Sequence, residues 1–150
     1  MLILIALFAA LTAPYIGQAL DRVQAGSEVR KIAAAMRTAR SDAIAEKRVL
    51  SSNGDLLGNT YWLSGMKEDG LHDKPDNRRR KVGRPVRFGE FNHLNETETE
   101  GRFVIRFFPL GNASGGSLTL RAKLGKNEIL NYEIHVDPVT GSPRIVQLEG

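Results

Sequence analysis

The sequence predicts an α+β protein in which a long N-terminal helix, hydrophobic and then amphipathic, packs on an antiparallel β-sheet body. Two observations predict this class. An almost uninterrupted apolar run over residues 1–16 continues into an amphipathic helical pattern that reaches Arg48. The second half of the chain consists of short β-prone runs separated by turn signals, which is typical of an antiparallel meander. The apolar face of such a sheet needs a cover, and the helix is the available element.

Length and composition allow one globular domain on a helical stem. The chain has 150 residues, with 21 basic residues against 17 acidic ones and a formal net charge of +4. This modest excess permits weak attraction to nucleic acid or anionic lipid but does not require it. The chain contains no cysteine, which excludes disulfides, a thiolate nucleophile and a cysteine-based zinc site.

Residues 1–20 are expected to form a membrane-spanning or filament-core helix. A spanning helix needs about 20 apolar residues, and the run supplies roughly 16 before Gln18 and Asp21. Pro14 removes one helical hydrogen bond, so a kink or local melting is expected near residues 10–17. The residues assigned to membrane anchoring and filament packing are Leu2, Ile3, Leu4, Ile5, Leu7, Phe8, Leu11, Pro14 and Ile16.

The residues that flank the apolar run do not decide whether it is a retained membrane anchor or a cleaved signal peptide. No basic residue precedes the run, whereas a cleavable signal peptide normally begins with positive charge. The small residues of Leu11-Thr12-Ala13 could still act as a cleavage site, so a secreted β-domain remains an alternative. The nearest cations, Arg22, Arg30 and Lys31, follow the run, and the positive-inside rule alone would keep the body in the cytoplasm. We therefore expect a segment that normally precedes Met1 to be missing.

Residues 21–48 are expected to form the amphipathic half of the same helix. Apolar residues recur there mostly at three- and four-residue steps, and charged residues fall mostly elsewhere, which predicts one packed face and one exposed face. The exposed face would meet water or neighbouring subunits. The residues expected to hold the stem on the body are Val29, Ile32, Ala33, Met36, Ala39, Ala43 and Ile44.

Residues 49–150 are expected to form the β-rich body. A first hairpin is predicted with strands at 49–52 and 59–64 and a turn at Asn53-Gly54-Asp55. A long exposed loop is expected over about 66–84, and a second, acidic loop over 92–101. The remaining predicted strands are 85–91, 102–108, 117–123, 128–136 and 144–148.

No catalytic constellation is present in the sequence. His72, His93 and His135 are scattered and have no serine or cysteine partner at a recognisable spacing. Residues 69–73 offer carboxylate and imidazole groups, but their spacing matches no EF-hand loop. We therefore expect no enzyme activity, no cofactor and no metal site.

A basic cluster is the sharpest local feature of the body. Such a cluster could contact nucleic-acid phosphates through salt-dependent attraction. The nearby aromatic residues are limited to Phe88 and Phe91, which are either available for base stacking or part of the core. Pairing with the acidic segment 96–100, in this or a neighbouring subunit, and docking to another filament component are equally open. The cluster consists of Arg78, Arg79, Arg80, Lys81, Arg84 and Arg87.

Three segments resemble a known family. The stem sequence over 33–48, the glycine-rich segment 107–116 and the segment 136–141 together resemble the H-type minor pseudopilins of the type II secretion system and the related minor type IV pilins. The resemblance covers the stem and residues 102–146. In the last two segments, glycines 111, 115, 116 and 141 are expected to adopt backbone angles forbidden to other residues, and Asn112, Ser114 and Asp137 to bond their own backbone.

The resemblance implies a non-enzymatic, single-pass protein of the bacterial inner membrane with its body in the periplasm. It would assemble with other pseudopilins and with secretion-system assembly components into a filament that pushes folded proteins outward. A minor type IV pilin that takes part in pilus assembly or DNA uptake is the alternative. Family members begin with a basic leader ending in glycine, followed by phenylalanine and glutamate; none of these precedes Leu2, so a start that is too late or a truncated chain is expected.

Overall fold

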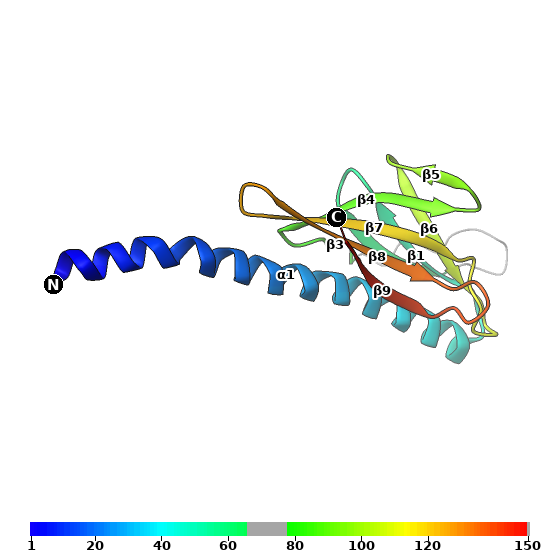
Figure 1. The fold of residues 1–150 in the computed structure, drawn as a ribbon. Helices are drawn as coiled ribbons and strands as arrows, with labels where there is room; N and C mark the ends of the chain where they lie inside the picture. The colour runs from blue at the N-terminus through cyan, green and yellow to red at the C-terminus, as the bar shows by residue number, and fades with distance from the viewer. Residues whose placement is uncertain (66–77, 150) are drawn as a thin grey trace.

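One long helix and two antiparallel sheets make up the computed structural model, which describes residues 1–65 and 78–149 (Figure 1). The helix α1 spans Leu2–Glu46. The first sheet has the order β3-β2-β1-β6 and the second the order β5-β4-β7-β8-β9. The predicted fold class is confirmed. The strands are β1 (Leu50–Asp55), β2 (Thr60–Gly65), β3 (Arg80–Lys81), β4 (Val86–His93), β5 (Glu96–Glu98), β6 (Arg102–Phe107), β7 (Gly116–Leu124), β8 (Glu128–Val136) and β9 (Pro143–Leu148).

The helix runs without a break through Pro14. The local melting expected near residues 10–17 is therefore wrong, because the loss of one backbone hydrogen bond does not outweigh the intact bonds on either side. The helix ends at Glu46 and is capped by Lys47, whose backbone adopts a left-handed conformation (φ 53°) and whose N–H donates to the carbonyl of Ala43. Its C-terminal half lies along the body, and its N-terminal half projects beyond it (Figure 1).

The two sheets differ from the single meander that the alternating pattern suggests. Among the described strands of the second sheet, β4 pairs with the following β5, and β7, β8 and β9 pair in succession, but β4 also pairs with the distant β7. In the first sheet, β6 pairs with β1. Hydrophobic alternation shows which face of a strand is buried but does not name its partner. The hydrophobic pattern therefore does not predict where the chain passes from one sheet to the other.

The turn of the first hairpin directly follows the three residues predicted to form it. Asn53 and Gly54 belong to β1, and the chain reverses at residues 56–59, where the Asp55 carboxylate accepts hydrogen bonds from the N–H groups of Leu57 and Gly58. Gly54 is not a turn residue; the absence of a side chain there makes room for a neighbouring ring. A Cβ at this position would overlap the ring of Phe103 on β6.

The predicted loops are partly structured. Residues 78–84 of the loop expected over 66–84 include β3, and Val82 is buried there, with its N–H bonded to the carbonyl of Asn59. Residues 66–77 lie outside the described part of the chain. The acidic loop expected over 92–101 contains β5, which pairs with β4 through residues such as Phe91 and Glu98.

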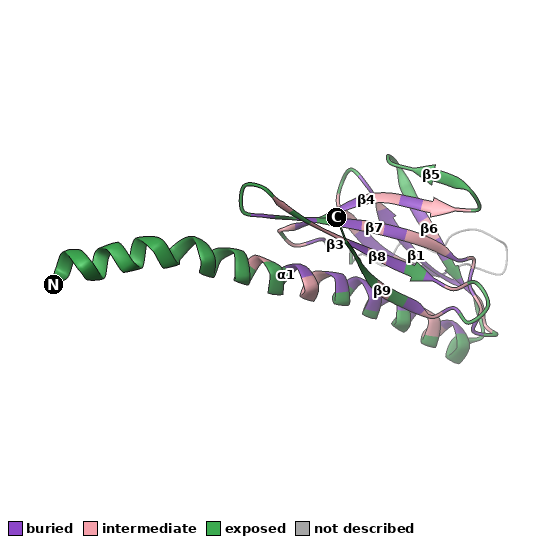
Figure 2. Cartoon of the chain, viewed as in Figure 1, coloured by how far each residue is buried: buried purple, intermediate pink, exposed green. Residues whose placement is uncertain are grey.

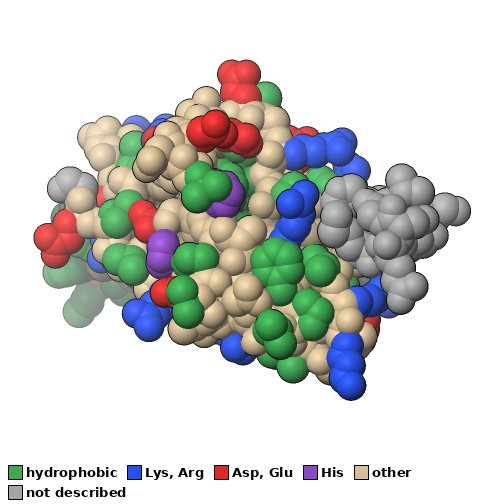
Figure 3. Space-filling model, turned by 90° about the vertical axis from the view of Figure 1, so that its right-hand side faces the viewer, with side chains coloured by type: hydrophobic (Ala, Val, Ile, Leu, Met, Phe, Trp, Pro, Cys, Tyr) green, Lys and Arg blue, Asp and Glu red, His purple; other side chains and the backbone are tan. Residues whose placement is uncertain are grey.

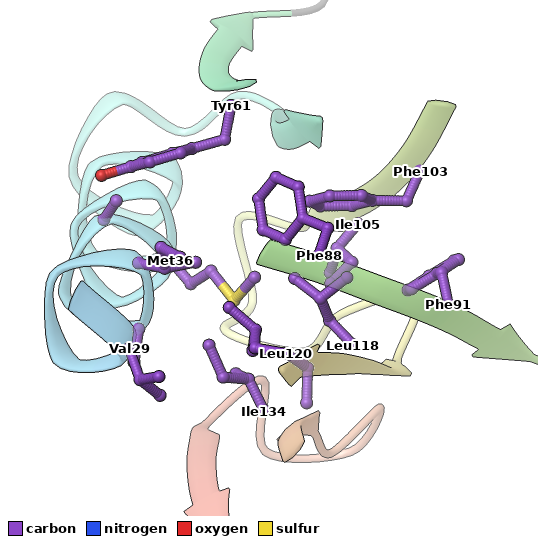
Figure 4. Close-up of a cluster of buried hydrophobic side chains, with 14 of the residues drawn as sticks. Val29, Met36, Tyr61, Phe88, Phe91, Phe103, Ile105, Leu118, Leu120 and Ile134 are labelled. Carbon is purple, nitrogen blue, oxygen red and sulfur yellow. The ribbon is translucent and has the colours of Figure 1, made fainter. Parts of the chain in front are cut away.

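The core lies between the helix and the inner faces of both sheets (Figure 4). Phe103 is its aromatic centre: its ring centroid lies 5.4 Å from that of Phe88 in an edge-to-face arrangement and 5.5 Å from that of Phe91. Met36 reaches into this cluster from α1, next to Leu120 and Ile134 of the second sheet (Figure 4). The helix is therefore part of the body's core along its C-terminal half.

Candidate functional site: the apolar helix and its junction with the body

The N-terminal half of α1 is fully exposed in the isolated chain (Figure 2). Apart from Pro14, which is also exposed, the predicted anchoring residues have exposed fractions between 58% and 84%. Exposure on this scale over a continuous helix is rare in soluble proteins and marks a surface that another apolar phase or partner covers. Tyr15, Leu20 and Val23 extend the same surface and were not in the predicted set.

This half of α1 is suited to an apolar environment by its length, its composition and the internal hydrogen bond of its hydroxyl group. The helix is long and apolar enough to cross a membrane by length and composition. Its one hydroxyl group before Tyr15 belongs to Thr12, whose Oγ1 donates to the backbone carbonyl of Phe8 at 3.0 Å. A polar group satisfied within its own helix can enter a bilayer at low cost.

The stripe predicted to hold the stem on the body is largely buried. Val29, Ala33, Met36, Ala39 and Ala43 have no exposed surface, and Ile32 is 1% exposed. Ile44 is 41% exposed and lies at the rim of the stripe, near the Gly111 turn. Ala25 and Ala35 are also buried and were missed, although Ala25 lies one helical turn before Val29.

Arg40 fastens the end of the stem to both glycine-rich turns. Its Nε lies 2.9 Å from the carbonyl oxygen of Gly111 and 2.9 Å from that of Thr140. A Cβ at Gly141 would overlap the Gly111 carbonyl oxygen, which explains why glycine is needed where the two turns meet. Arg40, in the first of the three segments that carry the family resemblance, thus contacts the other two.

The glycines of these turns have the backbone angles expected from the sequence. Gly111, Gly115, Gly116 and Gly141 have φ values of 91°, 78°, 135° and 66°. Asp137 bonds its own turn through the N–H groups of Val139 and Thr140, as predicted, and these bonds lower the pKa of its carboxyl group. Ser114 instead bonds across to β6, where its Oγ accepts from the N–H of Arg106.

Replacing Arg40 with methionine is expected to lower the free energy of unfolding by about 1–2 kcal/mol, because two carbonyl groups lose a charged donor at a partly solvated site. Urea denaturation of the detergent-solubilised chain, followed by the fluorescence of its single tryptophan, measures the change. Arg30→Met is the matched control, since Arg30 is exposed on the same helix and contacts neither turn. Equal losses in the two variants would contradict the fastening role.

Glu28 fastens the stem at a second point. Its Oε2 accepts a hydrogen bond from the N–H of Gly83 at 3.0 Å, and its Oε1 lies 2.6 Å from the Nζ of Lys31. Burial alone would raise the pKa of Glu28, but the hydrogen bonds from Lys31 and Gly83 outweigh it and hold the pKa below the ordinary 4.5. This contact ties the segment after β3 to the helix.

The stabilisation by Glu28 is expected to depend on pH. Because its pKa is lower in the folded state, the unfolded state takes up a proton first as the pH falls, so the contribution is complete above pH 4.5 and is lost below it as the carboxylate protonates. Urea denaturation of the chain and of Glu28→Gln at pH 7 and at pH 3 measures this. The stability gap between them should shrink at pH 3; a constant gap would contradict the assignment.

The basic cluster is exposed but does not form one site. Arg78, Arg79, Arg80, Lys81, Arg84 and Arg87 are all exposed. The guanidinium carbon of Arg79 lies 4.4 Å from the centroid of the Trp62 ring, on the first sheet, whereas Arg87 lies on β4 in the second sheet. Within the described parts of the chain, no ion pair joins the cluster to Glu96–Glu98. Figure 3 shows acidic side chains gathered at the top of the end opposite the N-terminus.

Of the two roles considered for Phe88 and Phe91, base stacking and core packing, the structure shows core packing. Phe88 is 8% exposed and Phe91 is 5% exposed, and both pack against Phe103. The cluster therefore offers cations without a stacking platform from these two rings.

The histidines serve local contacts where the structure describes them. His93 Nε2 lies 3.1 Å from the Ser114 carbonyl oxygen, and His135 Nδ1 lies 2.8 Å from Ser117 Oγ. His72 and the carboxylates of residues 69–73 lie outside the described residues. No group of three or more potential metal-binding side chains occurs within the described ranges 1–65 and 78–149.

The two-sheet body on a half-exposed helix defines a pilin-like subunit, and sequence comparison assigns the family. Residues 28–140 match the family model described as type II transport protein GspH. The chain therefore belongs to the GspH family. No curated protein matches the sequence.

Solved structures of pilin-like proteins share the fold. The minor pseudopilin EpsH from the type 2 secretion system of Vibrio cholerae matches with a TM-score of 0.63 and 12% identity, over 83% of this chain and 97% of that one. The type IV minor pilin FimU of Pseudomonas aeruginosa matches with a TM-score of 0.56 and 18% identity, over 85% of this chain and 90% of that one. At these identities the likeness shows the fold alone.

Proposed function

We propose that the chain is a minor pseudopilin, a structural subunit of a periplasmic pseudopilus that drives type II secretion of folded proteins. The observation that carries the proposal is the unbroken helix α1 of a GspH-family chain. It is exposed and apolar over its first half, and one face of its second half is buried against the body. One surface can then be covered by lipid before assembly and by neighbouring helices afterwards. The partners are other pseudopilins and the assembly components of the secretion system.

In this proposal the apolar half anchors the chain once through the inner membrane, with the body in the periplasm. Arg22, Arg30 and Lys31 do not oppose this orientation strongly, since whole domains are translocated largely regardless of their charge. Mass spectrometry of the native protein's N-terminus tests the anchor. Loss of the apolar half from the mature protein would contradict it and favour a secreted domain.

Deletion of the gene in its native host tests the filament role. The secreted proteins in the culture medium should fall and return when the gene is restored on a plasmid, while surface pili and twitching motility stay unchanged. Unchanged secretion would contradict the proposal.

A minor type IV pilin is the second candidate, because the minor pseudopilin EpsH and the minor pilin FimU share this fold and the fold does not separate the two roles. In this case the same deletion would reduce surface pili and motility and leave secretion intact. DNA uptake through the basic cluster is a further part of this alternative. Gel-shift titration with the full chain in detergent, repeated at increasing salt, tests it; absence of salt-sensitive binding at micromolar protein would exclude the DNA role.

A further inference from the structure

The end of the body nearest the apolar half of α1 contains an open cationic groove, which we call the proximal groove. Its volume is about 760 Å³, and its walls come from α1, from the turn between β1 and β2, from the segment between β3 and β4, and from the end of β7. Four exposed cations line it: Lys81, Arg84, Arg87 and Lys123. Lys123 is far in sequence from the other three, so only the fold brings it to the same surface.

The proximal groove lies where α1 leaves the body. Asp21, the residue after the exposed Leu20, is one of its lining residues. The turn between β7 and β8 approaches the same part of the helix: Gly125 lies next to Gln18, and Arg22 Nη2 lies 2.6 Å from Glu128 Oε1 at the start of β8. Figure 1 shows this turn extending along α1 toward the N-terminus. If Leu2–Leu20 spans a bilayer, the groove lies at the level of the lipid headgroups.

The charge at the groove is positive, and in the described part of the chain its cations are not paired with acidic side chains. None of its four cations forms an ion pair with any residue that the structure describes. Among the described acidic groups near it, Glu28 accepts from the N–H of Gly83 and is paired with Lys31. Asp21 is the one carboxylate among its lining residues, Asp55 is bonded to the N–H groups of its own turn, and Glu128 is paired with Arg22.

We propose that the proximal groove binds the headgroups of anionic phospholipids in the membrane leaflet that faces the body. The proposal rests on the membrane anchoring proposed above and adds the class of lipid that the body recognises. Basic residues close to an anionic membrane surface gain favourable binding of about five-fold each, an effect that falls off within a Debye length. Lipid contact would hold the body against the membrane before assembly, and the contact would break when the helix leaves the bilayer for the filament.

The experiment measures which lipid gathers at the groove. Because the chain has no cysteine, Leu57→Cys gives a unique labelling site; Leu57 lines the groove and is 73% exposed. The full chain, labelled there with an uncharged donor dye, is reconstituted into vesicles of phosphatidylcholine with a minor fraction of phosphatidylglycerol. Energy transfer is compared between trace acceptors on the acyl chain of either lipid. Transfer should indicate a local preference for phosphatidylglycerol on the order of five-fold, and 0.5 M salt should abolish it.

Two variants with the same net charge distinguish binding at the groove from an effect of the overall charge of the chain. Arg84→Gln/Arg87→Gln/Lys123→Gln should remove the preference. Lys47→Gln/Arg106→Gln/Arg144→Gln removes the same charge from exposed positions that do not line the groove, and it should retain the preference. Circular dichroism of both variants confirms that each is folded.

Two outcomes would overturn the lipid proposal alone. Equal transfer to both acceptors in a chain that resists carbonate extraction leaves the anchoring intact and removes lipid recognition. Equal transfer together with salt-sensitive binding of a labelled oligonucleotide, lost in the groove variant, would assign the groove to nucleic acid instead. Failure of the chain to remain in the vesicles would overturn the anchoring and the lipid proposal together.

Discussion

Replacing Phe103 with alanine is expected to lower the free energy of unfolding by about 3–5 kcal/mol, the cost of removing a buried aromatic ring. Phe103 is 1% exposed and joins the two sheets through the rings of Phe88 and Phe91. Its loss would leave a cavity at the centre of the core that the surrounding strands can close only in part. Urea denaturation followed by Trp62 fluorescence reports on the body, because Trp62 is the chain's one tryptophan and lies on β2.

A double-mutant cycle with Gly54 sharpens this expectation. Gly54→Ala alone should cost about 1–3 kcal/mol, because its methyl group overlaps the Phe103 ring and forces the packing apart. In the Phe103→Ala background, the same methyl group enters the vacated space, so the cost of Gly54→Ala should fall or change sign. Gly17→Ala is the control, since an added Cβ there meets nothing within 4 Å. Additive losses would show that Gly54 is required for another reason.

The helix and its buried stripe could be predicted because both depend on local sequence. The period of apolar residues after Asp21 indicates which face packs, and six of the seven residues assigned to it are buried. The exception, Ile44, shows the limit of this signal. It follows the apolar pattern near the end of α1, but the helix ends at Glu46 and the body beside it consists of turns that leave the side chain at the rim.

The misplaced first turn has a different cause. Asn53-Gly54-Asp55 has the composition of a tight turn, and the sequence offers no sign that Gly54 faces an aromatic ring almost 50 residues away. Asn53 is likewise held in the sheet by partners on the next strand, since its Nδ2 donates to Ser64 Oγ at 2.8 Å. Tertiary contacts of this kind outweigh local turn propensity, and they become visible only when the strands are paired.

The basic cluster is the instructive case for function. In sequence it is one run, but the fold separates it: Arg79 packs on Trp62, while Lys81, Arg84 and Arg87 join Lys123 in the proximal groove. Lys123 could not be assigned to the cluster from the sequence, because it lies on β7 and reaches the groove only through the pairing of β7 with β4. The run of charge was therefore detectable, whereas its division into two surfaces was not.

Replacing both Leu7 and Leu11, in the apolar half of α1, with arginine is expected to release the chain from the membrane. Leu7 and Leu11 lie one turn apart and are 59% and 65% exposed. In a spanning helix their side chains would lie near the middle of the bilayer, where each arginine costs about 2.5–3.5 kcal/mol. Leu7→Arg/Leu11→Arg should therefore lower the ratio of membrane-bound to soluble chain by at least about a hundred-fold after a carbonate wash. Quantitative immunoblotting of the membrane and soluble fractions measures it.

Ser41→Arg provides the control for added charge, because Ser41 is exposed on the half of α1 that lies along the body. It should leave membrane retention unchanged. Tryptophan fluorescence of the released double variant should match that of the parent, since Leu7 and Leu11 make no part of the core. Retention of the double variant at the parental level would mean that lipid does not cover this surface, and the exposed helix would then have to be buried by protein partners alone.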